Sequence, residues 1–292
     1  MKNWRFWSSS LAFVVFLAQT PSAEALLIPL RADWIANAGH HSTPAYVWQN
    51  DPEILKLYDV PSVTNLCVPA AIGTALINQF AYESPSSKNL KLVGYNAEAG
   101  KPASIDTAKL LADLAVRCKS DVREGTTIDD GVRCSAQFYQ DSGYVNAKVK
   151  LIRVYPYSLA GAGAEHENRL ANKADIEAAL AQGYQVIASI AMVQWDEASK
   201  EWKKVGSHAV NVMGLTTDRE TGVSKLFVTN PTRAYQVDGI HPIFDEATFG
   251  SATPEVAATL PAKYSPWLIT GRLLTRPNSL TVLAGLLLLR TN

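Results

Sequence analysis

The spacing of apolar residues changes near the middle of this chain, and that change limits the folds it can adopt. Before residue 145, apolar residues recur every three or four positions, as on the buried face of a helix, in the segments 67–80, 107–118 and about 130–143. After residue 145 they mostly alternate or form short runs, as in strands, apart from one helical pattern at 172–183. Helices gathered ahead of strands indicate an α+β fold.

The expected strands are short and follow one another closely, which favours an antiparallel sheet. They lie at 145–154, 185–193, 208–215 and 226–229, with a polar hairpin connection at 195–202 and a turn at 218–222. The chain has 292 residues, of which 47% are hydrophobic, enough for a full core. Its 27 basic and 27 acidic residues balance and form no Lys/Arg cluster, so we expect no nucleic-acid partner.

The first 25 residues have the pattern of an export signal. Lys2 and Arg5 precede an apolar core at 11–18, and Ala23-Glu24-Ala25 is a small-x-small cleavage site that predicts a mature start near residue 26. An uncleaved anchor is the alternative, although the apolar run is short for a membrane span. We therefore expect an exported protein: periplasmic, on the cell surface or secreted.

Behind this signal we expect three parts. Residues 26–60 show no clear period and are predicted to be an N-terminal extension, residues 61–275 the main domain, and residues 276–292 an apolar tail. The mostly apolar run 280–289 is ten residues long, too short to span an ordinary bilayer as a straight helix. The tail is either a sorting or anchoring segment, in which case it is the one expected route to a membrane, or a last helix or strand packed on the domain.

Three cysteines are an odd number for an exported chain. Cys118 and Cys134 lie 16 residues apart in neighbouring helical patterns. A disulfide between them would leave Cys67 as a free thiol, which suits a nucleophile. The alternative is that all three are small buried side chains without a bond.

Cys67, His208 and Asn230 stand where a cysteine nucleophile, its base and an orienting residue are expected. Cys67 begins a helical segment, where free N–H groups and the helix dipole should lower the pKa of a thiol. His208 opens one expected strand and Asn230 follows the next. Taken singly, each is more often a core, surface or turn residue; their joint order carries the argument. No cofactor and no metal site is expected, because neither ligand spacing nor a phosphate-binding glycine loop is present.

Several motifs agree with one known family. They are Asn65-Leu-Cys-Val-Pro-Ala-Ala71, Gly125-Thr-Thr-Ile-Asp-Asp130 with Phe138-Tyr139 and Gly143-Tyr144, the helical segment from Ile176 to Gly183, Gly206-Ser-His-Ala-Val210, and Val228-Thr-Asn-Pro231. Through them the chain resembles the papain-like cysteine peptidase superfamily, in its branch of bacteriocin-processing bacterial peptidases. The resemblance implies a papain-like fold, with a Cys-bearing helix packed on an antiparallel sheet that carries His and Asn. It also implies catalytic roles for Cys67, His208 and Asn230.

Two positions depart from this family. Val68 stands where a glycine usually follows the nucleophile, and Pro61 stands where the family has its oxyanion glutamine. Ser62, Thr64 or Asn65 could supply the missing donor, and Asn65 is the best candidate because its carboxamide is closest to that of glutamine. Loss of one such donor costs about 10²–10³ in rate.

These observations predict an exported cysteine peptidase that hydrolyses or transfers an amide bond of a peptide or protein through a thioester. The alternative is a weak or inactive papain-like module that binds peptides or cell-wall fragments, and a third reading is a structural domain in which the three residues coincide by chance. For catalysis, Cys67 Sγ and a nitrogen of His208 should lie within about 4 Å. Asn230 should then contact the other ring nitrogen.

Overall fold

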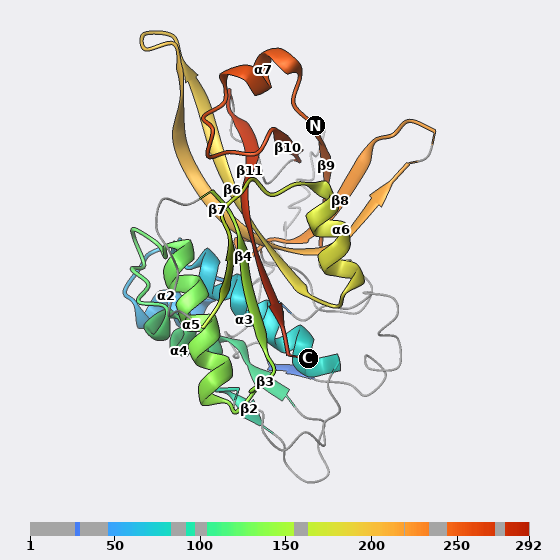
Figure 1. Ribbon diagram of the computed structural model, residues 1–292. Coiled ribbons are helices and arrows are strands. Elements are labelled where there is room, and N and C mark those ends of the chain that lie inside the picture. Colours follow the sequence, from blue (N-terminus) through green and yellow to red (C-terminus); the bar gives the residue numbers. More distant parts are fainter. Residues whose placement is uncertain are drawn as a thin grey trace, which may run out of the picture.

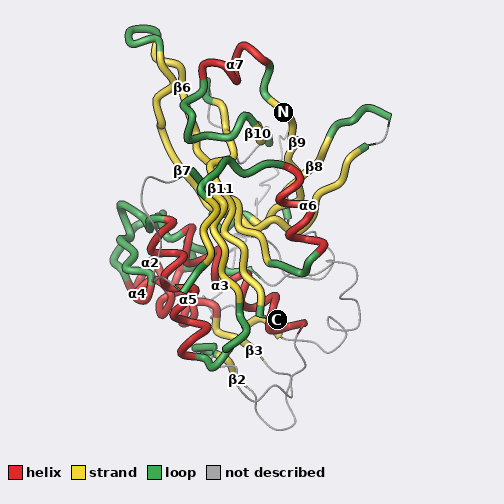
Figure 2. Tube along the Cα trace, viewed as in Figure 1, coloured by secondary structure: helices red, strands yellow, loops and turns green. Residues whose placement is uncertain are grey.

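The computed structural model describes residues 27–29, 46–82, 92–96, 104–154, 163–218, 220–233, 244–271 and 278–291. The expected export signal at 1–25 lies outside these residues. The described chain contains six helices, a sheet of three strands and a sheet of eight (Figure 1). The protein is therefore mixed α+β, as predicted, and most of its helices gather on one side of the long strands (Figure 2).

Four of the helices, at 67–82, 107–117, 128–141 and 173–181, form where the periodicity predicted them, and polar side chains fix several of their starts. The helices at 52–57 and 254–259 were not predicted. Asp106 and Thr127 each accept a hydrogen bond from the first turn of the helix that follows, and Asn172 and Asp175 form a reciprocal capping box. The helices are α2 (Pro52–Leu57), α3 (Cys67–Tyr82), α4 (Thr107–Arg117), α5 (Ile128–Asp141), α6 (Lys173–Ala181) and α7 (Pro254–Thr259).

A disulfide joins two of these helices. Cys118, the C-cap residue that follows α4, is bonded to Cys134 of α5, with a Cα–Cα distance of 4.9 Å. Both residues are buried in the core between the helices and the sheet. Cys67 is the free cysteine, so the predicted pairing is confirmed.

The large sheet has the strand order β10-β9-β8-β7-β6-β11-β4-β5, and only its β4–β5 pair is parallel. Leu268 of β10 also pairs with Val282 of β11, so strands β6 to β11 close into a ring. Its strands are β4 (Lys148–Ile152), β5 (Glu165–Glu167), β6 (Gln185–Asp196), β7 (Glu201–Thr217), β8 (Ser224–Thr229), β9 (Asp245–Ser251), β10 (Trp267–Thr270) and β11 (Leu280–Arg290). The small sheet has the order β1-β3-β2, with β1 (Leu27–Pro29), β2 (Tyr95–Asn96) and β3 (Ser104–Asp106).

The strands differ from the prediction in several places: β1, β2, β3, β5, β9 and β10 were not predicted, and some predicted strands have other bounds. The segment 195–202, expected to be a polar connection, continues both strands of the β6–β7 hairpin, because Trp195 pairs with Trp202 and their rings meet edge to face at 5.5 Å. The strand expected from residue 145 begins only at Lys148, and Val145 is exposed.

The apolar C-terminal run is a central strand of the protein. β11 lies between β6 and β4, and residues 281–289 are all buried. Its side chains enter two core clusters, Leu287 and Leu289 on the side of α3–α5, and Leu283 and Leu286 in the cluster that includes α6. Because both faces are covered, the strand needs a continuous apolar run rather than an alternating one. Of the two alternatives for the apolar run at 280–289, the structure shows a last strand packed on the domain.

Candidate active site

The start of α3 positions Cys67. Cys67 is the first helical residue, between the buried side chains of Leu66 and Val68, and it is itself only partly exposed. Asn211 of β7 donates a hydrogen bond of 2.8 Å to the carbonyl of Ala71, which ties the first turns of α3 to the sheet. A Cβ on Gly131 of α5 would lie 2.7 Å from Val68 Cγ1, so α5 packs closely against the same end of α3. The thiol is therefore fixed at the junction of helices and sheet.

Neighbouring strands bring His208 and Asn230 together. The register pairs Asn211 of β7 with Thr229 of β8, so Asn230 follows the last residue of β8, diagonally across from His208. His208 Nε2 lies 2.8 Å from Oδ1 of Asn230, which is fully buried. The same oxygen accepts hydrogen bonds from the backbone N–H and the hydroxyl of Thr232. Because a carboxamide oxygen only accepts, Nε2 carries the ring proton and Nδ1 is left as the acceptor.

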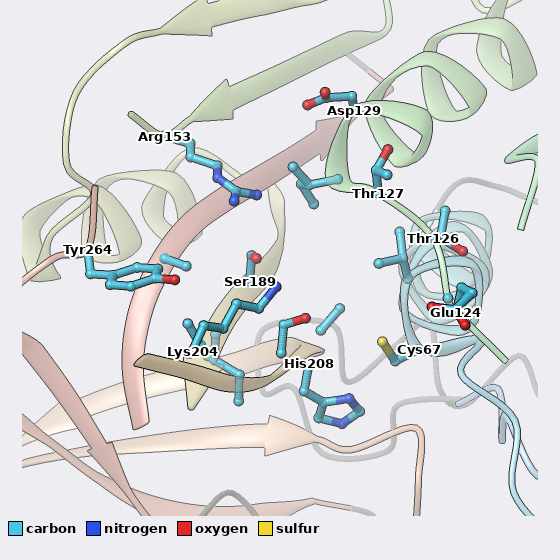
Figure 3. A pocket seen from close by; sticks show the side chains of 18 residues that line it. Cys67, Glu124, Thr126, Thr127, Asp129, Arg153, Ser189, Lys204, His208 and Tyr264 are labelled. Atoms are coloured by element: carbon cyan, nitrogen blue, oxygen red, sulfur yellow. The ribbon is translucent and has the colours of Figure 1, made fainter. Parts of the chain in front are cut away.

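Cys67 and His208 line one pocket of about 460 Å³. One wall comes from the start of α3 and from residues 124–129, which lead into α5; the other comes from β6, β7 and β11. Figure 3 shows Cys67 and His208 next to each other at one end of this space. The backbone N–H of Ala209, the residue after His208, interacts with the Cys67 sulfur, which joins the two walls at this point.

Burial keeps both groups neutral. It raises the pKa of the Cys67 thiol, and the opposing effect of the N–H groups of Ala209, Val68 and Cys67 itself is smaller. Burial also lowers the pKa of His208, against the smaller effect of the hydrogen bond that its ring donates to Asn230. The predicted lowering of the thiol pKa is therefore wrong in direction, because desolvation outweighs the N–H groups at the helix start.

Two expected contacts are not formed. Among the described residues, no hydrogen bond links Cys67 Sγ to the ring of His208, although both residues line the same pocket. Asn65 does not line the pocket; its side-chain amide donates to the carbonyl of Arg123. This arrangement does not support the expected role of Asn65 as the oxyanion donor.

Sequence reasoning missed part of the pocket. Arg153, Ser189, Lys204 and Tyr264 line it together with Cys67 and His208. They come from the end of β4, from β6, from β7 and from the segment before β10. No motif links these four positions in the sequence, so only the folded chain reveals them.

The described residues offer no group of three or more His, Cys, Asp and Glu side chains that could hold a metal ion. In the same part of the chain, no helix is both long enough and apolar enough to cross a membrane. Comparison with protein-family models, with curated proteins and with solved structures found no match to this chain.

Proposed function

We propose that this protein is an exported cysteine peptidase with a papain-like fold, in which Cys67 is the nucleophile, His208 the base and Asn230 the orienting residue. One observation carries the proposal: the hydrogen bond from His208 Nε2 to Asn230 Oδ1, beside a free thiol in the same pocket. The His208–Asn230 pair and a free thiol beside the same pocket support the roles of base, orienting residue and nucleophile in thiol acyl transfer.

The chemistry follows from the protonation states. The resting pair is a neutral thiol and a neutral imidazole whose Nδ1 is free to accept a proton. When a substrate carbonyl approaches, the thiol proton passes to Nδ1 as Sγ attacks the carbonyl carbon. The same nitrogen then returns the proton to the leaving amine, which leaves a thioester on Cys67 for water or an acceptor amine to resolve.

Backbone N–H groups replace the expected side-chain oxyanion donor in this proposal. The N–H groups of Cys67 and Val68 belong to the first turn of α3 and have no acceptor within the helix. They already interact with the sulfur, so they lie close to where the oxyanion of an attacked carbonyl would form. A site with backbone donors alone should be slower than one that also has a side-chain donor.

Two wider features support the proposal. A Cys-bearing helix packed on an antiparallel sheet that carries His208, with Asn230 just past the next strand, is the arrangement that the resemblance to papain-like peptidases implies. The Cys118–Cys134 disulfide agrees with an oxidising compartment, and hence with export.

A non-catalytic module that binds peptides in the same pocket is the second candidate. The amide of Asn65 is occupied by Arg123, and the raised pKa of Cys67 reduces the thiolate present at neutral pH. A binding module would keep the pocket and lack turnover.

The test separates the two candidates. The full chain, Cys67→Ala and His208→Ala would be incubated with a library of quenched fluorescent peptides, and each protein would be treated with an epoxide thiol reagent. We expect slow hydrolysis by the natural protein only, and covalent labelling at Cys67 in the natural protein. Hydrolysis that survives Cys67→Ala would refute the proposed nucleophile, and labelling without any hydrolysis would favour the binding module.

A further inference from the structure

The pocket carries positive charge away from Cys67. Arg153 and Lys204 line it, and Lys263 lies close enough to Lys204 to affect its pKa. In Figure 3 the polar ends of Arg153, Lys204 and Tyr264 point from three directions toward the space around Ser189. These residues belong to separate parts of the chain, so the fold itself brings the charges together.

These cations have no acidic partner in the part of the chain that the structure describes. Other basic residues do: Lys150 pairs with Glu167, and Arg169 with Asp175. The pKa of Lys204 is lowered, first by burial and then by repulsion from Arg153 and Lys263. Like charges held together without compensation are unfavourable for the empty pocket and favourable for an anion that enters it.

Two neutral hydrogen-bond donors lie near these cationic side chains. Tyr264 is 5% exposed, and burial raises the pKa of its hydroxyl, so the group stays protonated and can donate a hydrogen bond. Ser189 adds a second hydroxyl. The acidic residues of the pocket belong to the opposite wall: Glu124 precedes α5 and Asp129 lies in its first turn. A planar guanidinium, an ammonium and two hydroxyl donors suit a carboxylate.

We propose that this end of the pocket, formed by Arg153, Ser189, Lys204 and Tyr264, binds a carboxylate of the peptide substrate. The carboxylate belongs either to an acidic side chain or to a free C-terminus. This inference rests on the proposed function, because it names the substrate class of the same site. It also sets the orientation of the bound peptide in the pocket: the substrate carboxylate lies on the sheet side and the reacting amide lies at Cys67.

The test measures binding rather than turnover. Cys67→Ala in the full chain would be titrated against fluorescein-labelled peptides of one length: one with an internal glutamate and an amidated end, one with glutamine in its place, and one with glutamine and a free C-terminus. Fluorescence anisotropy would give each dissociation constant. We expect one or both carboxylate-bearing peptides to bind about tenfold tighter than the neutral one, with the difference shrinking as salt is added.

Substitutions test whether the preference for carboxylate-bearing peptides arises in the pocket. In the Cys67→Ala background, Lys204→Gln and Arg153→Gln should each reduce the carboxylate preference by about three- to tenfold, and Lys204→Arg should retain it. Lys148→Gln is the matched control, because Lys148 is exposed, lies outside the pocket and carries the same charge. Should Arg153→Gln fail to fold, Lys204→Gln still provides the comparison.

Equal binding of acidic and neutral peptides, a preference untouched by Lys204→Gln, or an equal loss in Lys148→Gln would overturn the inference. So would failure of every peptide to bind. Because the background lacks the thiol, these outcomes do not depend on whether Cys67 is catalytic. Hydrolysis by the natural protein with no carboxylate preference would sustain the proposed function and refute this inference alone.

Discussion

Replacing Asn230 with alanine should change the tautomer of His208. Oδ1 of Asn230 accepts three hydrogen bonds, from His208 Nε2 at 2.8 Å, from the Thr232 N–H at 3.1 Å and from the Thr232 hydroxyl at 2.7 Å. Thr232 is exposed, so water can replace its two bonds. The ring N–H of His208 is partly buried, and leaving it without an acceptor should cost about 1–3 kcal/mol of unfolding free energy.

The tautomer ratio should move by a smaller, measurable amount. A net hydrogen bond of about 1 kcal/mol corresponds to roughly a fivefold change in the ratio of Nε2–H to Nδ1–H imidazole. Long-range ¹H–¹⁵N NMR of histidine-labelled protein at neutral pH reads this ratio directly. Urea denaturation of the same samples gives the stability.

Asn230→Asp is the matched comparison. A carboxylate at the same place keeps an acceptor for Nε2–H, so the tautomer should be retained while the pKa of His208 rises. If Asn230→Ala leaves the nitrogen shifts of His208 unchanged while the protein stays folded, Asn230 does not orient the ring, and the proposed catalytic arrangement loses its main support.

Three further outcomes are expected. The double variant Cys118→Ser/Cys134→Ser should lose about 3 kcal/mol of unfolding free energy in urea, because the bond closes a loop with a sequence separation of 16, and an unchanged midpoint would contradict this. Because the pKa of His208 is lowered on folding, the unfolded chain takes up a proton first, so stability should fall as the pH drops below about 6.5. His208→Gln should flatten that part of the stability–pH curve. A curve identical to that of the natural protein would rule out His208 as the cause of the pH dependence. Gly285→Ala would place a Cβ 2.9 Å from a side chain of the neighbouring segment and should cost about 1–3 kcal/mol in thermal or urea unfolding, whereas Gly250→Ala, with nothing within 4 Å, should cost little; equal losses would argue against the close packing.

Local patterns in the sequence predicted most of the central elements. The periods of 3.6 and 2 located α3, α4, α5 and α6 and the inner parts of β6, β7 and β8, because each element buries one face or both. Residues 232–276, which contain β9, α7 and β10, gave no comparable pattern. In the structure β9 is placed by pairing with β8, and β10 by pairing with β9 and β11.

The apolar C-terminal run was ambiguous for a physical reason. A mostly apolar run of ten residues is compatible with an anchor, with a buried helix and with a strand covered on both faces. Only the neighbours of β11 decide among these, and β6 and β4 lie far from it in sequence.

The residues of the candidate site were likewise only partly predictable from the sequence. The sequence by itself determined which side chains could act as nucleophile, base and orienting residue, because their order and their placement on local elements are visible there. The tertiary structure decided that His208 bonds Asn230, that Asn65 turns to Arg123, and that burial raises rather than lowers the pKa of Cys67. It also decided the cationic end of the pocket. These properties depend on desolvation and on contacts between distant segments, neither of which a linear pattern specifies.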